Sequence, residues 1–297
     1  AHLLDQTLET LAVQQVASSV HWSVLVVDNN CTDDTEVVVK GHIQRGQIPG
    51  LRIVRETEQG LSCARRRAVQ ESVAPWIAFV DDDCLLEPDW IQQAFVFCQM
   101  HPCAGAIGGQ VHLLWETPPE PLVLQYARYL AYQDHGDEPC QMPTAGITYL
   151  VGAGLILQRA ALEKSGWLER GILVDRKGKQ LSTGGDVEIV LRIRRAGYEL
   201  WYHPELKLQH YIPVQRISTE YIARLERANA QILPALNLLS KEQKADFKTC
   251  FGGIAKSTVL LLRALASTIW RDLIPKQQLS PERRISLSRA VGNVQGH

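Results

Sequence analysis

Three consecutive carboxylates, Asp81, Asp82 and Asp83, follow an apolar run over residues 76–80. Adjacent like charges repel one another, and neither a protein core nor the end of a strand requires them. A divalent cation would offset that repulsion, because Mg²⁺ and Mn²⁺ prefer oxygen ligands and keep open positions for phosphate oxygens. The alternative is a solvated acidic turn. We expect a metal site of the Asp-x-Asp kind, because the triplet follows a buried strand and stands beside other polar motifs.

A second carboxylate that could take part in a reaction is Asp186. It begins an apolar helical pattern over residues 186–196, which ends at Gly197. A carboxylate in the first turn of a helix is stabilised in its charged form by the helix dipole. Asp186 is therefore suited to act as a general base. The alternative interpretation is an ordinary capping aspartate.

Elements that position these carboxylates follow from the apolar runs. Residues 23–28, 51–55 and 76–80 indicate buried strands, and helical patterns at the start of the chain, at 62–72 and after Pro88 alternate with them. This order predicts an α/β fold with an open, mostly parallel sheet flanked by helices. Ligands of such sheets bind beyond the carboxyl ends of the strands, where Asp28 and the acidic triplet lie.

Composition agrees with a globular enzyme, since 45% of the 297 residues are hydrophobic and 21% are charged. The seven cysteines form no CxxC pair, which favours a reducing compartment without structural zinc. The net charge of -1 divides into -8 over residues 1–214 and +7 over residues 215–297. We expect an α/β domain over 1–214 and a basic, helical extension over 215–297, which includes an amphipathic stretch at 251–274. A basic helical extension suits an anionic membrane surface, although a solvated helical face has the same composition.

Several motifs together resemble those of family 2 glycosyltransferases of the GT-A fold, in particular a bacterial polysaccharide-assembly type. They are Val26-Val-Asp-Asn-Asn-Cys-Thr-Asp-Asp-Thr, Gly60-Leu-Ser-Cys-Ala-Arg, Phe79-Val-Asp-Asp-Asp, and Gly185-Asp-Val-Glu with Pro204-Glu and His210 beyond it. The resemblance covers roughly residues 1–214.

For the nucleotide-sugar donor, the resemblance implies five binding residues. Asp28 would hydrogen-bond the nucleotide base, Glu56 would line the same pocket, and Arg65 would lie near the base or the diphosphate. Asp81 and Asp82 would face the ribose and the diphosphate.

For the metal and the chemistry, the resemblance implies three residues. Asp83 would bind Mg²⁺ or Mn²⁺, with His210 as a further ligand. Asp186 would deprotonate the acceptor hydroxyl as it attacks the anomeric carbon.

The chain departs from the family pattern in three places. The family's usual first strand is missing, so we expect that the sequence begins after it. Gly185 stands where the family often has a glutamate before the catalytic aspartate. An Ala-Arg-Asn-x-Gly segment appears as Ala64-Arg-Arg-Arg-Ala68, which leaves the donor-phosphate side open.

The function predicted is inverting transfer of a sugar from a UDP- or dTDP-sugar to a saccharide or lipid-linked acceptor in polysaccharide or cell-envelope glycan synthesis. We expect a cytoplasmic enzyme with peripheral contact at the inner face of the plasma membrane through residues 215–297, and no nucleic-acid partner. Two alternatives stay open: an inactive nucleotide-binding scaffold on the same fold, and a sugar nucleotidyltransferase. A nucleotidyltransferase would carry a Gly-rich phosphate loop near its N-terminus, and none is visible. A dinucleotide-binding oxidoreductase is disfavoured because no GxGxxG follows a strand.

Overall fold

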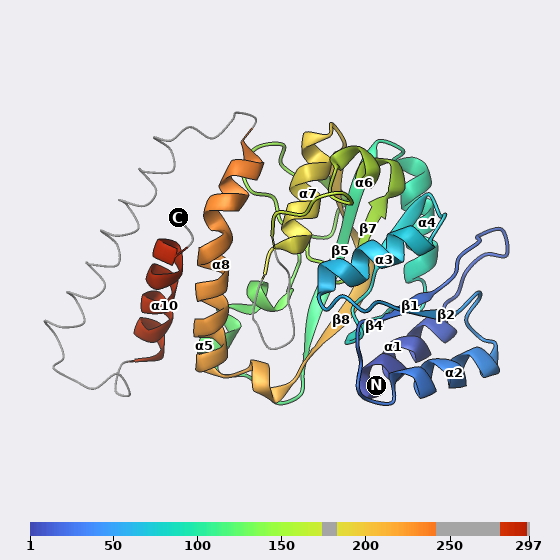
Figure 1. The fold of residues 1–297 in the computed structure, drawn as a ribbon, viewed down its shortest axis with the longest axis horizontal. Coiled ribbons are helices and arrows are strands. Elements are labelled where there is room, and N and C mark those ends of the chain that lie inside the picture. The colour runs from blue at the N-terminus through green and yellow to red at the C-terminus, as the bar shows by residue number, and fades with distance from the viewer. Residues whose placement is uncertain (174–182, 242–279, 296–297) are drawn as a thin grey trace, which may run out of the picture.

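The computed structural model describes residues 1–173, 183–241 and 280–295. Strands gather into a twisted central layer with helices packed around them, and two C-terminal helices lie at one side (Figure 1). The mixed α/β fold class predicted from the sequence is confirmed.

The N-terminal part pairs two helices with two short strands: α1 (His2–Ala12), β1 (Leu25–Asp28), α2 (Thr35–Arg45) and β2 (Arg52–Arg55). Helix α1 forms because Leu4, Leu8 and Leu11 recur at helical spacing, and all three are buried. Strands β1 and β2 are parallel, with Asp28 opposite Arg55. Their carboxyl ends therefore meet at one edge.

The other strands form a six-stranded sheet in the order β3-β7-β5-β8-β4, with β6 paired to β8. They are β3 (Trp76–Phe79), β4 (Cys84–Leu86), β5 (Ala104–Trp115), β6 (Cys140–Gln141), β7 (Leu155–Gln158) and β8 (Glu199–Ile212). The long strands β5 and β8 are parallel, whereas β3–β7, β5–β7, β4–β8 and β6–β8 are antiparallel. The register of β5 on β8 shifts at Gly109, where a Cβ atom would lie 2.0 Å from the Leu206 carbonyl oxygen. A glycine there lets the two backbones approach.

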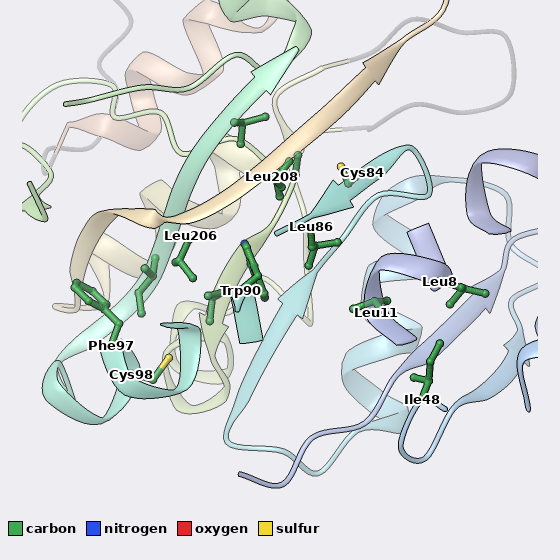
Figure 2. Packing of buried hydrophobic residues seen from close by; sticks show 14 of the residues in the cluster. Leu8, Leu11, Ile48, Cys84, Leu86, Trp90, Phe97, Cys98, Leu206 and Leu208 are labelled. Carbon is green, nitrogen blue, oxygen red and sulfur yellow. The ribbon is translucent and has the colours of Figure 1, made fainter. Parts of the chain in front are cut away.

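Helices cover the sheet: α3 (Leu61–Glu71), α4 (Trp90–Met100), α6 (Arg159–Ser165) and α7 (Gly185–Arg195). The hydrophobic cluster in Figure 2 runs from Leu8 and Leu11 of α1, through Leu86 and Trp90, to Leu206. Because one cluster joins α1 to β4 and β8, it fixes β4, the strand that follows the acidic triplet, against β8.

Short helical segments follow the two long strands: α5 (Pro121–Leu124) and η1 (Ala127–Leu130) come after β5, and η2 (Val214–Arg216) comes after β8. The proposed domain boundary at residue 214 falls at the start of η2. Helix α8 (Thr219–Ser240) begins at Ser218, whose hydroxyl accepts a hydrogen bond from the Tyr221 amide at 3.2 Å.

Helix α10 (Pro281–Gln295) packs along α8 (Figure 1). The carboxylate of Glu226, which is 2% exposed, accepts a hydrogen bond from Arg289 Nε at 2.9 Å across this contact. Among the residues described, none of the helices combines the length and apolar character that crossing a membrane requires. The amphipathic stretch expected at 251–274 lies outside the described residues.

Candidate active site

Asp83 lies at the centre of a polar cluster at the start of β4, beside β8. Its side chain is 8% exposed, and its Oδ1 lies 3.2 Å from His210 Nε2. Its Oδ2 accepts a hydrogen bond from Arg216 Nη1 at 3.3 Å. The pairing of β4 with β8 explains the first contact, because it places Cys84 opposite His210. Two basic side chains thus balance one buried carboxylate.

The orientation of the His210 ring is fixed by a hydrogen bond to the backbone. Its Nδ1 lies 2.8 Å from the Leu130 carbonyl oxygen, to which an Nδ1–H donates. This bond turns Nε2 toward Asp83. Burial by itself would lower the pKa of His210, but the hydrogen bond and the charge of Asp83 outweigh it and raise the pKa.

Asp81, Asp83 and Cys84 have possible ligand atoms that all lie within 4.8 Å of one another. Burial raises the pKa of the Cys84 thiol well above its usual value, so the sulfur stays protonated and is a poor ligand. Desolvation by the surrounding protein raises the pKa of Asp82, and the charges of Asp83 and Asp81 raise it further. Carboxylate oxygens beside an imidazole suit a hard divalent cation, so this cluster fits Mg²⁺ or Mn²⁺.

Asp186 is held at the N-terminal end of α7. Its Oδ2 accepts a hydrogen bond from the Gly152 amide at 2.9 Å, and its Oδ1 accepts one from the Val187 amide at 2.9 Å. Two hydrogen bonds from backbone amides fix the position of the carboxylate. Asp186 is partly exposed, so a substrate could reach its side chain.

Arg65 connects Asp186 to the acidic triplet. It is 6% exposed, its Nη2 lies 3.9 Å from Asp81 Oδ1, and its Cζ lies 5.3 Å from the centre of the Phe79 ring. A Cβ atom added to Gly152 would lie 2.5 Å from Arg65 Nη2 and 3.4 Å from Asp186 Cβ. The guanidinium and the proposed base therefore meet at Gly152.

Of the apolar run over residues 150–157, only the part from Leu155 onward belongs to β7. Residues before it form a buried turn, in which Gly154 has φ 73° and donates a hydrogen bond to the Phe79 carbonyl oxygen at 2.9 Å. This turn brings the Gly152 amide to Asp186.

Asp28 and Glu56 form a second group at the carboxyl ends of β1 and β2. The Glu56 amide donates to the Asp28 carbonyl oxygen at 2.8 Å. Each side chain accepts a hydrogen bond from a nearby amide: Asp28 Oδ1 from Cys31 at 2.7 Å, and Glu56 Oε1 from Glu58 at 2.6 Å. The sequence-predicted residues thus divide into this group and the cluster of Arg65, Asp81, Asp83, Asp186 and His210, with Asp82 within the acidic loop.

Sequence reasoning missed Arg216, and it did not predict that Gly152 contacts Asp186. Arg216 contacts Asp83 across 133 residues of chain, and no local motif announces it. Gly152 holds Asp186 through its amide across 34 residues, and its only signal is the Gly152-Ala-Gly154 spacing.

Comparison with known proteins places the fold among sugar-transferring enzymes. The family model of glycosyl transferase family 2 matches residues 1–166, a range that ends before Asp186 and His210. Solved structures with the same fold include TarS 1–349 of S. aureus in complex with UDP, with a TM-score of 0.51, 16% identity and coverage of 98% of this chain and 85% of that one. Another is the mannosyltransferase PcManGT of Pyrobaculum calidifontis in complex with GDP-Man and Mn²⁺, with a TM-score of 0.58, 17% identity and coverage of 99% and 83%. No curated protein matches the chain.

Proposed function

This chain belongs to glycosyl transferase family 2, and on that premise we propose that it is an inverting, metal-dependent sugar transferase. Its donor is a UDP- or dTDP-sugar, and its acceptor is a saccharide or lipid-linked hydroxyl in polysaccharide or cell-envelope glycan synthesis. The proposal rests on the observation that two carboxylates are each held in a fixed position. Asp83 is buried beside His210, and Asp186 is fixed by two backbone amides.

Asp83 and His210 hold the metal in this proposal, with Asp81 as a further oxygen ligand. His210 Nε2 lies 3.2 Å from Asp83 Oδ1, and one carboxylate oxygen of Asp81 lies within 4.8 Å of one of Asp83. A Mg²⁺ or Mn²⁺ ion held there would supply positive charge to offset that of the departing diphosphate. The Mn²⁺ in the complex of the Pyrobaculum calidifontis mannosyltransferase supports this assignment.

The nucleotide lies against the edge formed by β1 and β2. Asp28 accepts a hydrogen bond from the base, and Glu56 lines the same pocket. Arg65 carries a positive charge between Asp81 and Asp186, where it offsets the charge of the diphosphate. Arg216, whose Nη1 lies 3.3 Å from Asp83 Oδ2, is a second cationic side chain that would offset the charge of the diphosphate.

Asp186 takes the proton of the acceptor hydroxyl while that oxygen attacks the anomeric carbon. The bond from the anomeric carbon to the diphosphate oxygen breaks, and the nucleoside diphosphate leaves with the bonding electrons. The configuration at the anomeric carbon is inverted, because attack and departure occur on opposite faces. The amides of Gly152 and Val187 keep the carboxylate aimed throughout.

The basic extension over residues 215–297 is proposed to bring the enzyme to an anionic membrane surface. This proposal depends on its charge of +7. Sedimentation with liposomes containing anionic lipid tests it by comparing the full chain with residues 1–214, after circular dichroism has shown that the shortened chain folds. Equal binding of the two chains to the liposomes would refute the proposal.

The test of the catalytic proposal is release of nucleoside diphosphate from a panel of UDP- and dTDP-sugars with Mn²⁺, for the wild type and Asp186→Asn. We expect turnover by the wild type and a loss of at least about a hundredfold in the variant. Donor binding without turnover would favour an inactive scaffold. Release of pyrophosphate from a nucleoside triphosphate and a sugar phosphate would favour a nucleotidyltransferase.

A further inference from the structure

A buried glutamine lies between the segments that carry the proposed metal ligand and the proposed base. Gln133 is 4% exposed and lies between η1 and β6. Its backbone amide donates to the Val111 carbonyl oxygen at 3.1 Å, and the Val111 amide donates to the Gln133 carbonyl oxygen at 2.8 Å. These reciprocal hydrogen bonds fix the backbone of Gln133 to β5.

The Gln133 side chain connects β5 to the turn before β7. Its Nε2 donates to the Gly109 carbonyl oxygen at 2.7 Å, and its Oε1 accepts a hydrogen bond from the Val151 amide at 3.0 Å. A Cβ atom added to Gly108 would lie 2.8 Å from Gln133 Nε2, so the glycine leaves the room that the amide group needs. One buried side chain therefore satisfies backbone groups of two different segments.

The turn that Gln133 holds also binds the proposed base. Val151 is followed by Gly152, whose amide donates to Asp186 Oδ2 at 2.9 Å. Two successive amides thus have different acceptors, the first on Gln133 and the second on Asp186. Displacing Val151 would displace the Gly152 amide with it, because one planar peptide group joins the two residues.

The anchor on β5 leads to the proposed metal ligand. Strand β5 is parallel to β8, and its Leu113 lies opposite His210. Three residues before Gln133, the Leu130 carbonyl oxygen lies 2.8 Å from His210 Nδ1 and accepts its hydrogen bond. The segment 130–133 therefore contacts the metal ligand at its first residue and the turn of the base at its last.

We propose that Gln133 is a positioning residue for sugar transfer, which sets the place of the Asp186 carboxylate relative to His210. This inference rests on the proposed function, in which Asp186 is the base. Proton transfer requires the base within hydrogen-bonding distance of the hydroxyl, and a misplacement of about 1 Å can lower the rate about a hundredfold. Because Gln133 acts through the Val151–Gly152 turn, its loss should slow turnover and leave donor affinity unchanged.

Gln133→Met tests the proposal, because methionine is an unbranched side chain of similar length that lacks the amide group. The assay is release of nucleoside diphosphate from the UDP- or dTDP-sugar that the wild type turns over with Mn²⁺. We expect kcat to fall at least about tenfold, while donor affinity from isothermal titration calorimetry stays within about twofold.

The matched control is Gln14→Met, because Gln14 makes the same two kinds of hydrogen bond elsewhere in the fold. Its Nε2 donates to the Glu87 carbonyl oxygen at 2.8 Å, and its Oε1 accepts a hydrogen bond from the Ile91 amide at 3.0 Å. Gln14→Met should keep kcat within about twofold of the wild type. Circular dichroism establishes that each variant is folded.

Combination with Asp186→Asn separates a positioning role from a structural one. If Gln133 acts through the base, Gln133→Met should slow Asp186→Asn by less than about twofold, because the base is already lost. A general loss of packing would slow both backgrounds by the same factor. Gln133→Glu serves as a second variant if Gln133→Met does not fold. Its carboxylate cannot donate to the Gly109 carbonyl oxygen, so kcat should fall at least about threefold with donor affinity retained.

Failure of this inference can be distinguished from failure of the proposed function. A folded variant of Gln133 with the kcat of the wild type, or an equal loss in both backgrounds, would overturn the inference while the transferase stands. Donor affinity that falls together with kcat would also overturn it, because the residue would then serve the donor site. If the wild type turns over no donor, or if Asp186→Asn is as active as the wild type, the proposed function fails and the inference with it.

Discussion

Glu188 is expected to fix α7, the helix that carries the proposed base, to the segment that contains residues 172 and 173. Its side chain is 0% exposed and accepts hydrogen bonds from the Ile172 and Leu173 amides, each at 2.7 Å. It also accepts one from Arg192 Nε at 2.7 Å. Hydrogen bonds to a charged group contribute about 1.5–3 kcal/mol each, and removing one partner of a buried ion pair costs about 3–5 kcal/mol.

Glu188→Ala should therefore lower the free energy of unfolding by about 3–5 kcal/mol, which corresponds to a fall in melting temperature on the order of 10 °C. Differential scanning fluorimetry measures it. The matched control is Glu163→Ala, because Glu163 forms an exposed i,i+4 pair with Arg159 on α6. That pair contributes less than about 0.5 kcal/mol. A fall in Glu188→Ala no larger than in the control would refute the reasoning.

Two further predictions concern the close approach at the base and the C-terminal helices. Gly152→Ala places a Cβ atom 2.5 Å from Arg65 Nη2 and 3.4 Å from Asp186 Cβ, so it should reduce transfer at least about tenfold by moving one or both groups. Circular dichroism and steady-state kinetics check this, and a fully active, folded variant would contradict it. Arg289→Ala leaves the Glu226 carboxylate, 2% exposed, without this partner and should destabilise the α8–α10 contact by about 3 kcal/mol. Limited proteolysis should then cleave α10 faster in Arg289→Ala than in Arg289→Lys, and equal rates would refute it.

The local parts of the fold were predictable from the sequence. The strands ending at Asp28 and before Asp81 follow from short apolar runs bounded by polar residues, and α7 follows from a 3.6-residue pattern between Asp186 and Gly197. An apolar run by itself does not separate a strand from a buried turn. Residues 150–157 are such a run, and only the part from Leu155 onward is a strand.

Long-range contacts were beyond local reasoning. His210 was assigned to Asp83 only by family resemblance, and the β4–β8 pairing supplies the physical reason that the two meet. The contacts of Arg216 with Asp83 and of Gly152 with Asp186 join residues that are far apart in the sequence, and no motif spacing predicts them. The family resemblance was confirmed, and its matched range is residues 1–166.

The central claim is that Asp83 organises a metal-dependent donor site. Isothermal titration calorimetry of UDP- and dTDP-sugars tests it most directly, for the wild type and Asp83→Asn, with Mn²⁺ and with EDTA. We expect at least one donor to bind the wild type with Mn²⁺ and to bind at least about tenfold more weakly in EDTA or in Asp83→Asn. Equal affinity with and without Mn²⁺, or an Asp83→Asn variant that binds the donor as the wild type does, would contradict the claim.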